Sequence, residues 1–381
     1  MRLLNTSSLD LKEFSGIKKP PYAILSHTWG EEEVLFEHIQ NGTSSSKKAY
    51  AKVIGCCRKA VEDGLEWVWI DTCCINKTSS AELSEAINSM YKWYETSAIC
   101  YVYLQDVASV RRSFAGFSRS RWFKRGWTLQ ELVAPKAVEF YNSQWEEIGT
   151  KGSLASKISA ITLIPVRILH GDSPSTCNIA ERMSWASARQ TTREEDLAYC
   201  LLGLFDVNMP LLYGEGAKSF IRLQEHIIKQ EEDYSIFAWT SRRDRGKSLT
   251  GFLASSPAEF AGDVSLKLPL PKPFALSSQF DEFGANKTPG AGLRLIYAKD
   301  YERLRKHDFQ KCPAEDIPQE PPQLTARGLR ISLPIIHPAD PGLPALAWIY
   351  YEIDDRLLCI FLEQSSIDSS QLLGRHSSQW L

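Results

Sequence analysis

Three short apolar segments, separated by two segments of helical periodicity, constrain the fold of this 381-residue chain more than any other feature. The apolar segments are 22–26, 67–71 and 98–104. Between them, residues 47–63 and 81–94 place their apolar side chains on one face of a helix. Short buried strands that alternate with helices predict a parallel sheet with right-handed crossovers. We therefore expect an α/β fold, an open and mostly parallel sheet with flanking helices.

The same pattern continues toward the middle of the chain and then changes. A helix is expected at 121–133 and a strand at 137–141, so that the α/β domain spans residues 1–150. Residues 151–230 are expected to form a helical extension, with helices at 153–162, 178–188, 193–204 and 216–230. Residues 231–381 are expected to form a smaller β-rich region, a partly closed sandwich or barrel. Its expected strands are 234–239, 293–297, 329–333, 346–352 and 357–362, with Pro-rich stretches at 268–273 and 313–322.

Composition and charge exclude several classes of protein. The chain is 43% hydrophobic and 24% charged, which is typical of globular proteins, and its net charge is −2, so it has no global field that attracts nucleic acid. It has no run of about 18 apolar residues, and we expect no membrane span. The amino terminus lacks the apolar core of a secretory signal. Nine cysteines without a regular spacing favour reduced, buried thiols in a cytoplasmic protein.

Polar residues at the carboxyl ends of the first two predicted strands mark the candidate site. Ligands of open α/β sheets bind at this edge, where Ser26-His27 and Asp71 are expected to meet in one crevice. The expected catalytic residues are His27, Asp71 and Glu85, and the expected ligand-binding residues are Ser26, Trp29, Arg125 and Trp127. Arg125 would serve as the anion partner. In a continuous helix, Glu131 would point roughly 120° away from Arg125, so these two residues are not expected to share a pocket.

Each of these residues also has a purely structural interpretation. Asp71 could cap a helix or turn, and His27 could satisfy a buried backbone group. Trp29 and Trp127 could be packing residues, Glu85 could lie on a solvated helix face, and Arg125 could be a structural ion-pair partner. A basic cluster could be either a solvated surface or a site for phosphate or a partner; its members are Arg111, Arg112, Arg119, Arg121, Lys124 and Arg125. The sequence leaves these alternatives open.

Other chemistries find less support in the sequence. A thiol hydrolase would pair Cys74 with His27, but at most one of Cys73 and Cys74 can face the imidazole if the chain is extended. The adjacent cysteine pairs lack the two-residue gap of zinc sites, so no metal site is expected. Residues 214–219 lack the Gly-Lys-Ser order of a phosphate loop and are expected to begin a helix.

Several ordered blocks resemble the signature of the heterokaryon-incompatibility (HET) domain. They run from Tyr22 to Gly30, from Trp69 to Asn76, from Arg125 to Leu132, and over the helical block from Glu85 to Tyr91. The resemblance covers roughly residues 20–150, and residues 178–230 resemble the helical segment that often follows this domain in fungi. Lys77 departs from the pattern, because the family usually has Gln after Ile-Asn.

The resemblance implies a role in fungal non-self recognition, in which HET domains trigger growth arrest or death after incompatible cells fuse. The expected function is thus an effector of vegetative incompatibility that works through protein partners or self-association. HET domains are also similar to TIR domains, several of which cleave NAD. One alternative is therefore a TIR-like NAD glycohydrolase that uses Glu85, with NAD as substrate and no other cofactor. A second alternative is a non-catalytic sensor or scaffold.

Overall fold

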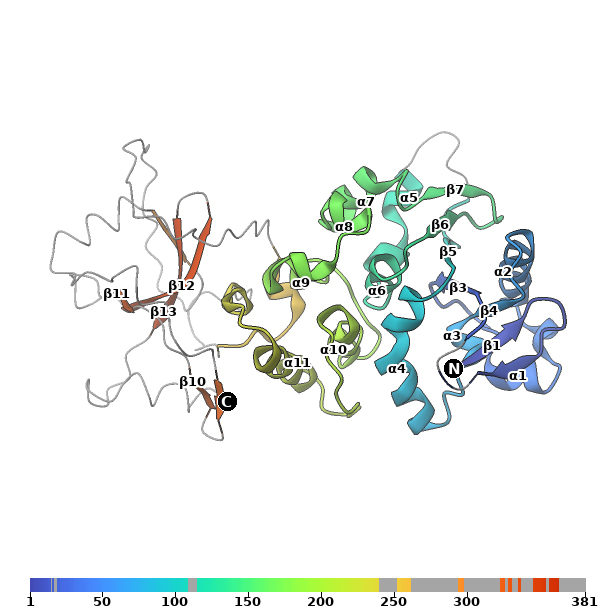
Figure 1. Cartoon of the computed structure of the whole chain (residues 1–381), viewed down its shortest axis with the longest axis horizontal. Coiled ribbons are helices and arrows are strands. Elements are labelled where there is room, and N and C mark those ends of the chain that lie inside the picture. Colours follow the sequence, from blue (N-terminus) through green and yellow to red (C-terminus); the bar gives the residue numbers. More distant parts are fainter. Residues whose placement is uncertain are drawn as a thin grey trace. The chain divides into compact units, whose positions relative to one another are not determined.

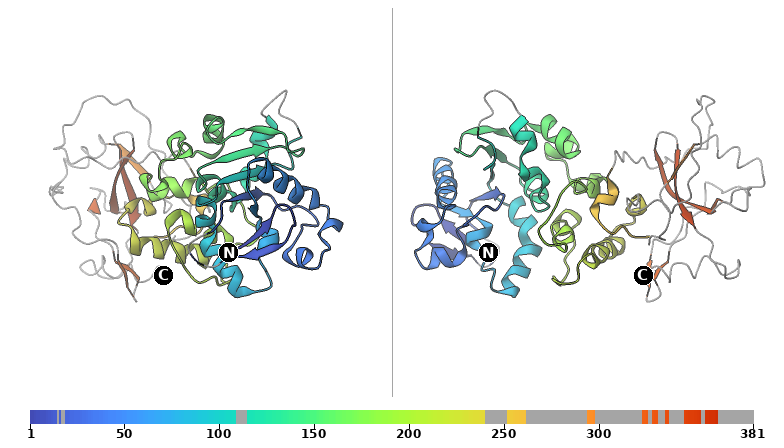
Figure 2. Two further views of the ribbon diagram at one scale, coloured as in Figure 1. Left: turned by 45° about the vertical axis from the view of Figure 1, so that its right-hand side comes forward. Right: turned by 180° about the vertical axis from the view of Figure 1, so that it is seen from behind.

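The computed structural model describes residues 1–14, 16, 19–108, 115–239 and 252–261, and the backbone of six strands between residues 294 and 362 (Figures 1 and 2). The chain divides into two compact units. The first unit comprises Met1–Thr176 and Ala188–Ser219, and the second comprises Cys177–Ser187 and Phe220–Leu381. The predicted Pro-rich stretches, together with Arg111 and Arg112, lie outside the described residues.

A seven-stranded sheet forms the centre of the first unit, in the order β2-β1-β4-β3-β5-β6-β7. Its strands are β1 (Arg2–Asn5), β2 (Leu11–Glu13), β3 (Tyr22–His27), β4 (Trp67–Trp69), β5 (Ile99–Tyr103), β6 (Val138–Tyr141) and β7 (Glu147–Thr150). The central strands β4, β3, β5 and β6 pair in parallel, and the outer strands β1, β2 and β7 add antiparallel pairs, with β2 and β7 at the two edges. The α/β prediction is confirmed, whereas these three short outer strands were not predicted.

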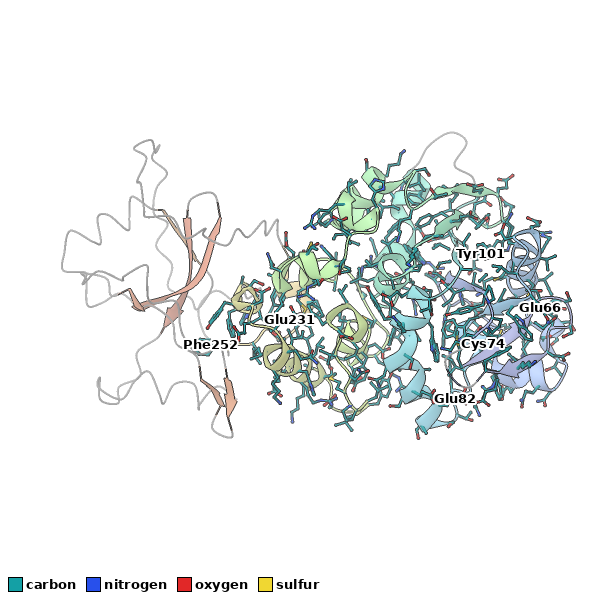
Figure 3. The ribbon with its side chains drawn as sticks, in the orientation of Figure 1. Glu66, Cys74, Glu82, Tyr101, Glu231 and Phe252 are labelled. Atoms are coloured by element: carbon teal, nitrogen blue, oxygen red, sulfur yellow. The ribbon has the colours of Figure 1, made fainter. Side chains whose placement is uncertain are left out.

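Helices cover both faces of this sheet, because its central strands are apolar on both sides. All six residues of β3 are buried. Helix α2 (Tyr50–Glu62) lies on one side of the sheet, and α4 (Ser80–Glu95) and α6 (Thr128–Val133) lie on the other (Figure 1). Arg2 connects β1 to α4, since its guanidinium donates to both oxygens of Glu82 at 2.7 and 3.2 Å (Figure 3).

The second predicted strand ends earlier than expected. Strand β4 stops at Trp69, and Asp71 begins the short helix α3 (Asp71–Cys74) instead of ending the strand. Ile70 remains extended and serves as the N-cap residue of this helix. Asp71 therefore lies in the first turn of α3, where an acidic side chain is favoured by the helix dipole.

The single helix predicted over 121–133 is wrong. The segment forms a 3-10 turn, η2 (Arg121–Lys124), then an extended Arg125, and then α6. Gly126 N donates to Gln190 O at 2.8 Å, and Gln190 N donates to Lys124 O at 2.6 Å. The Lys124 carbonyl and the Gly126 N–H thus pair with Gln190, which is distant in sequence, and not within a helix. Here tertiary hydrogen bonds outweigh the helical periodicity of the sequence.

The rest of the first unit is mainly helical. Its helices are α1 (Phe36–Gln40), α5 (Ala115–Arg119), α7 (Ala155–Thr162), α8 (Val166–Leu169) and α10 (Asp196–Tyr199), with 3-10 turns η1 (Ser44–Ser46), η3 (Pro174–Thr176) and η4 (Leu202–Phe205). The helix predicted at 153–162 is slightly shorter than expected, and α1, α5 and α8 were not predicted. The helix predicted at 193–204 is thus divided into α10 and η4. The Glu195 carboxylate accepts from Gly214 N at 2.7 Å and Gly216 N at 3.1 Å, and so holds the glycine loop that precedes α11.

The second unit contains helices α9 (Ile179–Ser184) and most of α11 (Lys218–Gln230), with 3-10 turns η5 (Tyr234–Phe237) and η6 (Pro257–Phe260). The strand predicted at 234–239 is wrong, because Asp233 caps a helical turn by accepting from Ser235 N. Arg182 of α9 is buried and pairs with Glu231 at 2.5 Å (Figure 3).

The described strands of the carboxyl-terminal part pair in two antiparallel sheets. One contains β9 (Gln323–Thr325) and β10 (Gly328–Arg330). The other has the order β11-β12-β13-β8, with β8 at Arg294–Tyr297, β11 at Ile335–Ile336, β12 at Ala345–Ile353 and β13 at Arg356–Leu362. Within the part of the chain that the structure describes, no helix combines the length and the apolar character required to cross a bilayer.

Candidate functional site

The carboxyl ends of β3 and β4 bring together two of the predicted site residues. His27 is the last residue of β3, and Asp71 opens α3 just beyond β4. Their side chains approach so that His27 Nε2 lies 3.9 Å from Asp71 Oδ1. Two neighbouring parallel strands end at the same edge, which explains why residues 44 positions apart face each other.

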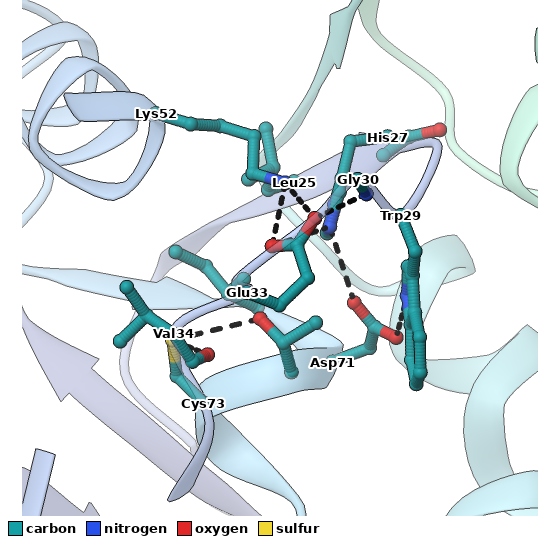
Figure 4. A network of polar contacts seen from close by, with 12 residues as sticks. Leu25, His27, Trp29, Gly30, Glu33, Val34, Lys52, Asp71 and Cys73 are labelled. Atoms are coloured by element: carbon teal, nitrogen blue, oxygen red, sulfur yellow. Dashed lines mark hydrogen bonds and ion pairs between the residues drawn. The ribbon is translucent and has the colours of Figure 1, made fainter. Parts of the chain in front are cut away.

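A buried ion pair between Glu33 and Lys52 lies next to His27 (Figure 4). Lys52 of α2 donates to both carboxylate oxygens of Glu33 at 2.7 Å, and the Gly30 backbone N–H donates to the same carboxylate at 2.7 Å. Glu33 Oε2 lies 3.8 Å from His27 Nε2. Because Lys52 and Glu33 are both only 6% exposed, the pair is shielded from water and from salt screening.

His27 is held in its neutral form. Burial and the positive charge of Lys52 hold the pKa of His27 well below its usual value. Its Nε2 atom is buried and has no hydrogen-bond partner among the described residues. Two carboxylate oxygens lie near it without a direct hydrogen bond, Glu33 Oε2 at 3.8 Å and Asp71 Oδ1 at 3.9 Å. An imidazole whose pKa is lowered in this way is a weak base at neutral pH.

Trp29 and Lys77 form the outer wall beside Asp71. Trp29 Nε1 donates to Asp71 Oδ2 at 2.9 Å, and Lys77 Nζ lies 3.4 Å from the same oxygen. The Lys77 ammonium also lies 3.5 Å from the centroid of the Trp29 ring. Although burial opposes ionisation, Lys77 and the Trp29 N–H hold the pKa of Asp71 below its usual value. Asp71 is therefore an ionised carboxylate that faces a cation and an exposed indole.

A second buried network surrounds Ser26 on the opposite side of the strand end. Trp122 Nε1 donates to Ser26 Oγ at 2.7 Å, and the Ser26 hydroxyl donates to Glu131 Oε2. Tyr94 donates to Leu25 O at 3.1 Å and shares Glu131 as a hydrogen-bond partner. Burial raises the pKa of Glu131 to about 8, and the negative charge of Asp71 adds to this effect. Glu131 is therefore a protonated acid at neutral pH.

The prediction that Arg125 and Glu131 do not share a pocket needs correction. That prediction assumed one continuous helix, but the chain is extended at Arg125. The positive charge of Arg125 acts on Glu131 and opposes the rise of its pKa, and it also lowers the pKa of His27. Arg125 thus belongs to the electrostatic surroundings of both buried networks.

The structure does not bring all predicted residues into the His27 cluster. Glu85 is exposed on α4, where its carboxylate forms no hydrogen bond or ion pair with any described residue, and its charge acts on Lys19. Trp127 instead donates to Asp196, which also accepts from Tyr213 at 3.0 Å. A ligand that contacted Glu85 or Trp127 would therefore bind away from the His27 cluster.

The thiols give no support to nucleophilic chemistry. Cys73 donates to Val34 O at 3.3 Å, and burial raises the pKa of Cys73 to about 12. Cys74 is also buried, with its pKa raised well above the usual value. Such groups remain thiols at neutral pH, and a thiol is a poor nucleophile compared with a thiolate.

Three residues of these networks were not predicted from the sequence: Glu33, Lys52 and Trp122. Lys52 lies four residues before Cys56, so it shares the apolar face of α2, and a lysine on such a face is a recognisable signal. Glu33 ends a run of three glutamates, which is typical of a solvated surface. Trp122 shows no local pattern that separates a hydrogen-bonding role from ordinary packing.

Glu131→Gln is expected to flatten the pH dependence of stability. The folded carboxyl has a pKa of about 8 against an ordinary value of 4.5, so its contribution is fully present below about pH 4.5 and is lost as pH rises through about 8. The wild-type free energy of unfolding should therefore fall between these limits, by on the order of 4 kcal/mol, and that of Glu131→Gln should not. Urea unfolding at pH 5.5 and 8.5 measures this difference. Glu85→Gln, which alters an exposed carboxylate, serves as the control and should keep the wild-type slope.

Comparison with known proteins gives two results. The family model described as "Heterokaryon incompatibility protein (HET)" matches residues 22–115, which include Ser26, His27 and Asp71. A 230-residue stretch is 48% identical to the vegetative incompatibility protein HET-E-1 of Podospora anserina. This alignment covers 58% of the chain but only 17% of that relative, so the chain corresponds to a small part of its length. No solved structure matches the chain.

Proposed function

Because the chain carries a heterokaryon-incompatibility (HET) domain, we propose that it is an effector of fungal vegetative incompatibility, whose activated form arrests growth or kills the cell. The observation that carries this proposal is the 48% identity over 230 residues to a vegetative incompatibility protein. The His27–Asp71 cluster lies inside the matched domain, so it is the part of the fold that we expect to produce the toxicity.

Expression of the full chain from an inducible promoter in a filamentous fungus is expected to arrest growth. Asp71→Asn should restore growth to that of cells with an empty vector, because it removes the charge that Trp29 and Lys77 bind. Colony counts measure the effect, and an immunoblot confirms equal accumulation. Asp10→Asn, an exposed carboxylate of the same type, is the matched control and should remain toxic. Unchanged toxicity in Asp71→Asn would assign this cluster a structural role only.

Cleavage of NAD or a related nucleotide is a second candidate function. It is favoured by the ionised Asp71 carboxylate next to a neutral His27, with the exposed Trp29 ring as a surface for a base. In such a reaction a carboxylate stabilises the ribosyl cation or orients water. Purified, concentrated protein incubated with NAD should then release nicotinamide, measured by liquid chromatography. Toxicity without any nicotinamide release would remove this candidate and leave the effector proposal intact.

Variants can assign the carboxylate of that reaction. Loss of turnover in Glu85→Ala would place the chemistry on the exposed face of α4, whereas loss in Asp71→Asn alone would place it at the strand ends. A protein that neither kills nor turns over NAD but still binds its partners would be the sensor or scaffold.

We also propose a TIR-like or flavodoxin-like class for the fold and a cytoplasmic location. The order β4-β3-β5-β6 of the parallel strands, which is second, first, third, fourth along the chain, supports this fold class. Free, buried cysteines at the seven positions whose side chains the structure describes are typical of a reducing compartment. Activation through a protein partner or self-association is part of the same proposal.

A further inference from the structure

The Lys77 ammonium lies against the face of the Trp29 ring and next to the Asp71 carboxylate. Its nitrogen lies 3.5 Å from the centroid of the Trp29 ring and 3.4 Å from Asp71 Oδ2. The indole itself is fixed, because its N–H donates to the same carboxylate oxygen at 2.9 Å. Aromatic faces attract cations through the ring quadrupole, and a carboxylate at the ring edge strengthens the attraction.

We propose that Trp29 and Asp71 form a binding subsite for a flat, weakly hydrated organic cation of the N-alkylpyridinium type, and that Lys77 of the chain itself occupies this subsite in the structure. The proposal rests on this geometry and holds whether or not the protein kills cells or cleaves NAD.

The buried side of the subsite distinguishes it from an ordinary surface ion pair. The second oxygen of Asp71 faces His27 Nε2 at 3.9 Å, and this buried nitrogen has no hydrogen-bond partner among the described residues. His27 is 1% exposed and neutral, so it does not cancel the charge of Asp71. The hydrogen bond from Trp29 and the ion pair with Lys77 both lie on Oδ2, so Asp71 directs its charge to the outer side.

The outer side is open to a ligand. Trp29 is 43% exposed, and Lys77 lies in the loop between α3 and α4 with 28% of its side chain exposed. Lys77 can therefore leave the ring without disturbing a helix or strand. A lysine ammonium is strongly hydrated, whereas a flat delocalised cation loses less hydration and matches the shape of the indole. Such a ligand would replace Lys77 on the ring and next to Asp71.

1-Methylnicotinamide, which is methylated on its ring nitrogen, and nicotinamide provide a matched test, because they differ mainly in the positive charge of the ring. Binding to the purified full chain is measured by calorimetry and by the shift of the Trp29 indole N–H resonance, assigned by its loss in Trp29→Phe. The cation should shift this resonance in wild type, and Lys77→Ala should bind it about tenfold more tightly, since a tethered competitor has been removed. Nicotinamide should not bind either protein.

Further variants separate the subsite from a general charge effect. Lys77→Arg keeps a tethered cation and should bind no tighter than wild type. In the Lys77→Ala background, Trp29→Leu and Asp71→Asn should each abolish binding. Lys48→Ala removes an exposed lysine that pairs with Glu31 and Glu32, and it should leave binding unchanged. Equal binding of both ligands, or no resonance shift with the cation in wild type, would overturn the proposal. Both of these results are measured on the wild-type protein, so they do not depend on whether a variant folds.

Discussion

Lys52→Met is expected to lower the free energy of unfolding by about 3–5 kcal/mol, because it leaves a buried carboxylate without its counter-charge. The Lys52 ammonium donates to both oxygens of Glu33, and each side chain is only 6% exposed. The Gly30 N–H, which also donates a hydrogen bond to Glu33, is neutral and cannot replace a full positive charge. Chemical unfolding followed by tryptophan fluorescence measures the loss.

A second variant shows whether the cost comes from the unpaired charge. Lys52→Met combined with Glu33→Gln removes both charges but keeps an acceptor for Gly30 N, and it should recover most of the lost stability. Lys48→Met removes a lysine whose side chain is 67% exposed and should change stability by less than about 1 kcal/mol. Equal stability of Lys52→Met and Lys48→Met would contradict the prediction, because it would mean that water solvates the Glu33 carboxylate in solution.

Gly203→Ala is expected to destabilise the first unit by about 3 kcal/mol or more, since overpacking against rigid atoms cannot be relieved by a rotamer change. A Cβ at this position would lie 2.0 Å from Tyr91 Cβ and 2.4 Å from Tyr91 Cγ. Tyr91 Cβ is bonded directly to the backbone of α4, so the clash can be relieved only if η4 moves away from α4. Thermal unfolding should show a fall in Tm on the order of 10 °C.

Gly116→Ala is the matched control for this substitution. Gly116 lies in α5, and an added Cβ would meet only Val107 Cγ1 at an ordinary 3.9 Å. Alanine is a better helix former than glycine, so this variant should be neutral or up to about 1 kcal/mol more stable. A Gly203→Ala protein with the wild-type Tm would mean that α4 and η4 are separated more widely than the structure shows.

The buried networks depend on residues whose roles local sequence does not reveal. Glu33 belongs to an acidic run that is typical of solvent, yet it is 6% exposed because Lys52 reaches it from another helix. The Arg125 segment has helical periodicity, yet backbone pairing with Gln190 holds it extended. In both cases the deciding partner lies far away in sequence, so no local pattern contains the information.

The sequence by itself determined the alternation of apolar strands and amphipathic helices, and hence the parallel centre of the sheet and the edge at which His27 and Asp71 meet. Periodicity is sufficient there, because side-chain direction in strands and helices follows from backbone geometry alone. Only the tertiary structure decided which charges are buried, that Glu131 is a neutral acid beside Ser26, and that Lys77 covers Trp29. Burial and pairing are properties of groups from several elements, and they exist only once those elements have packed together.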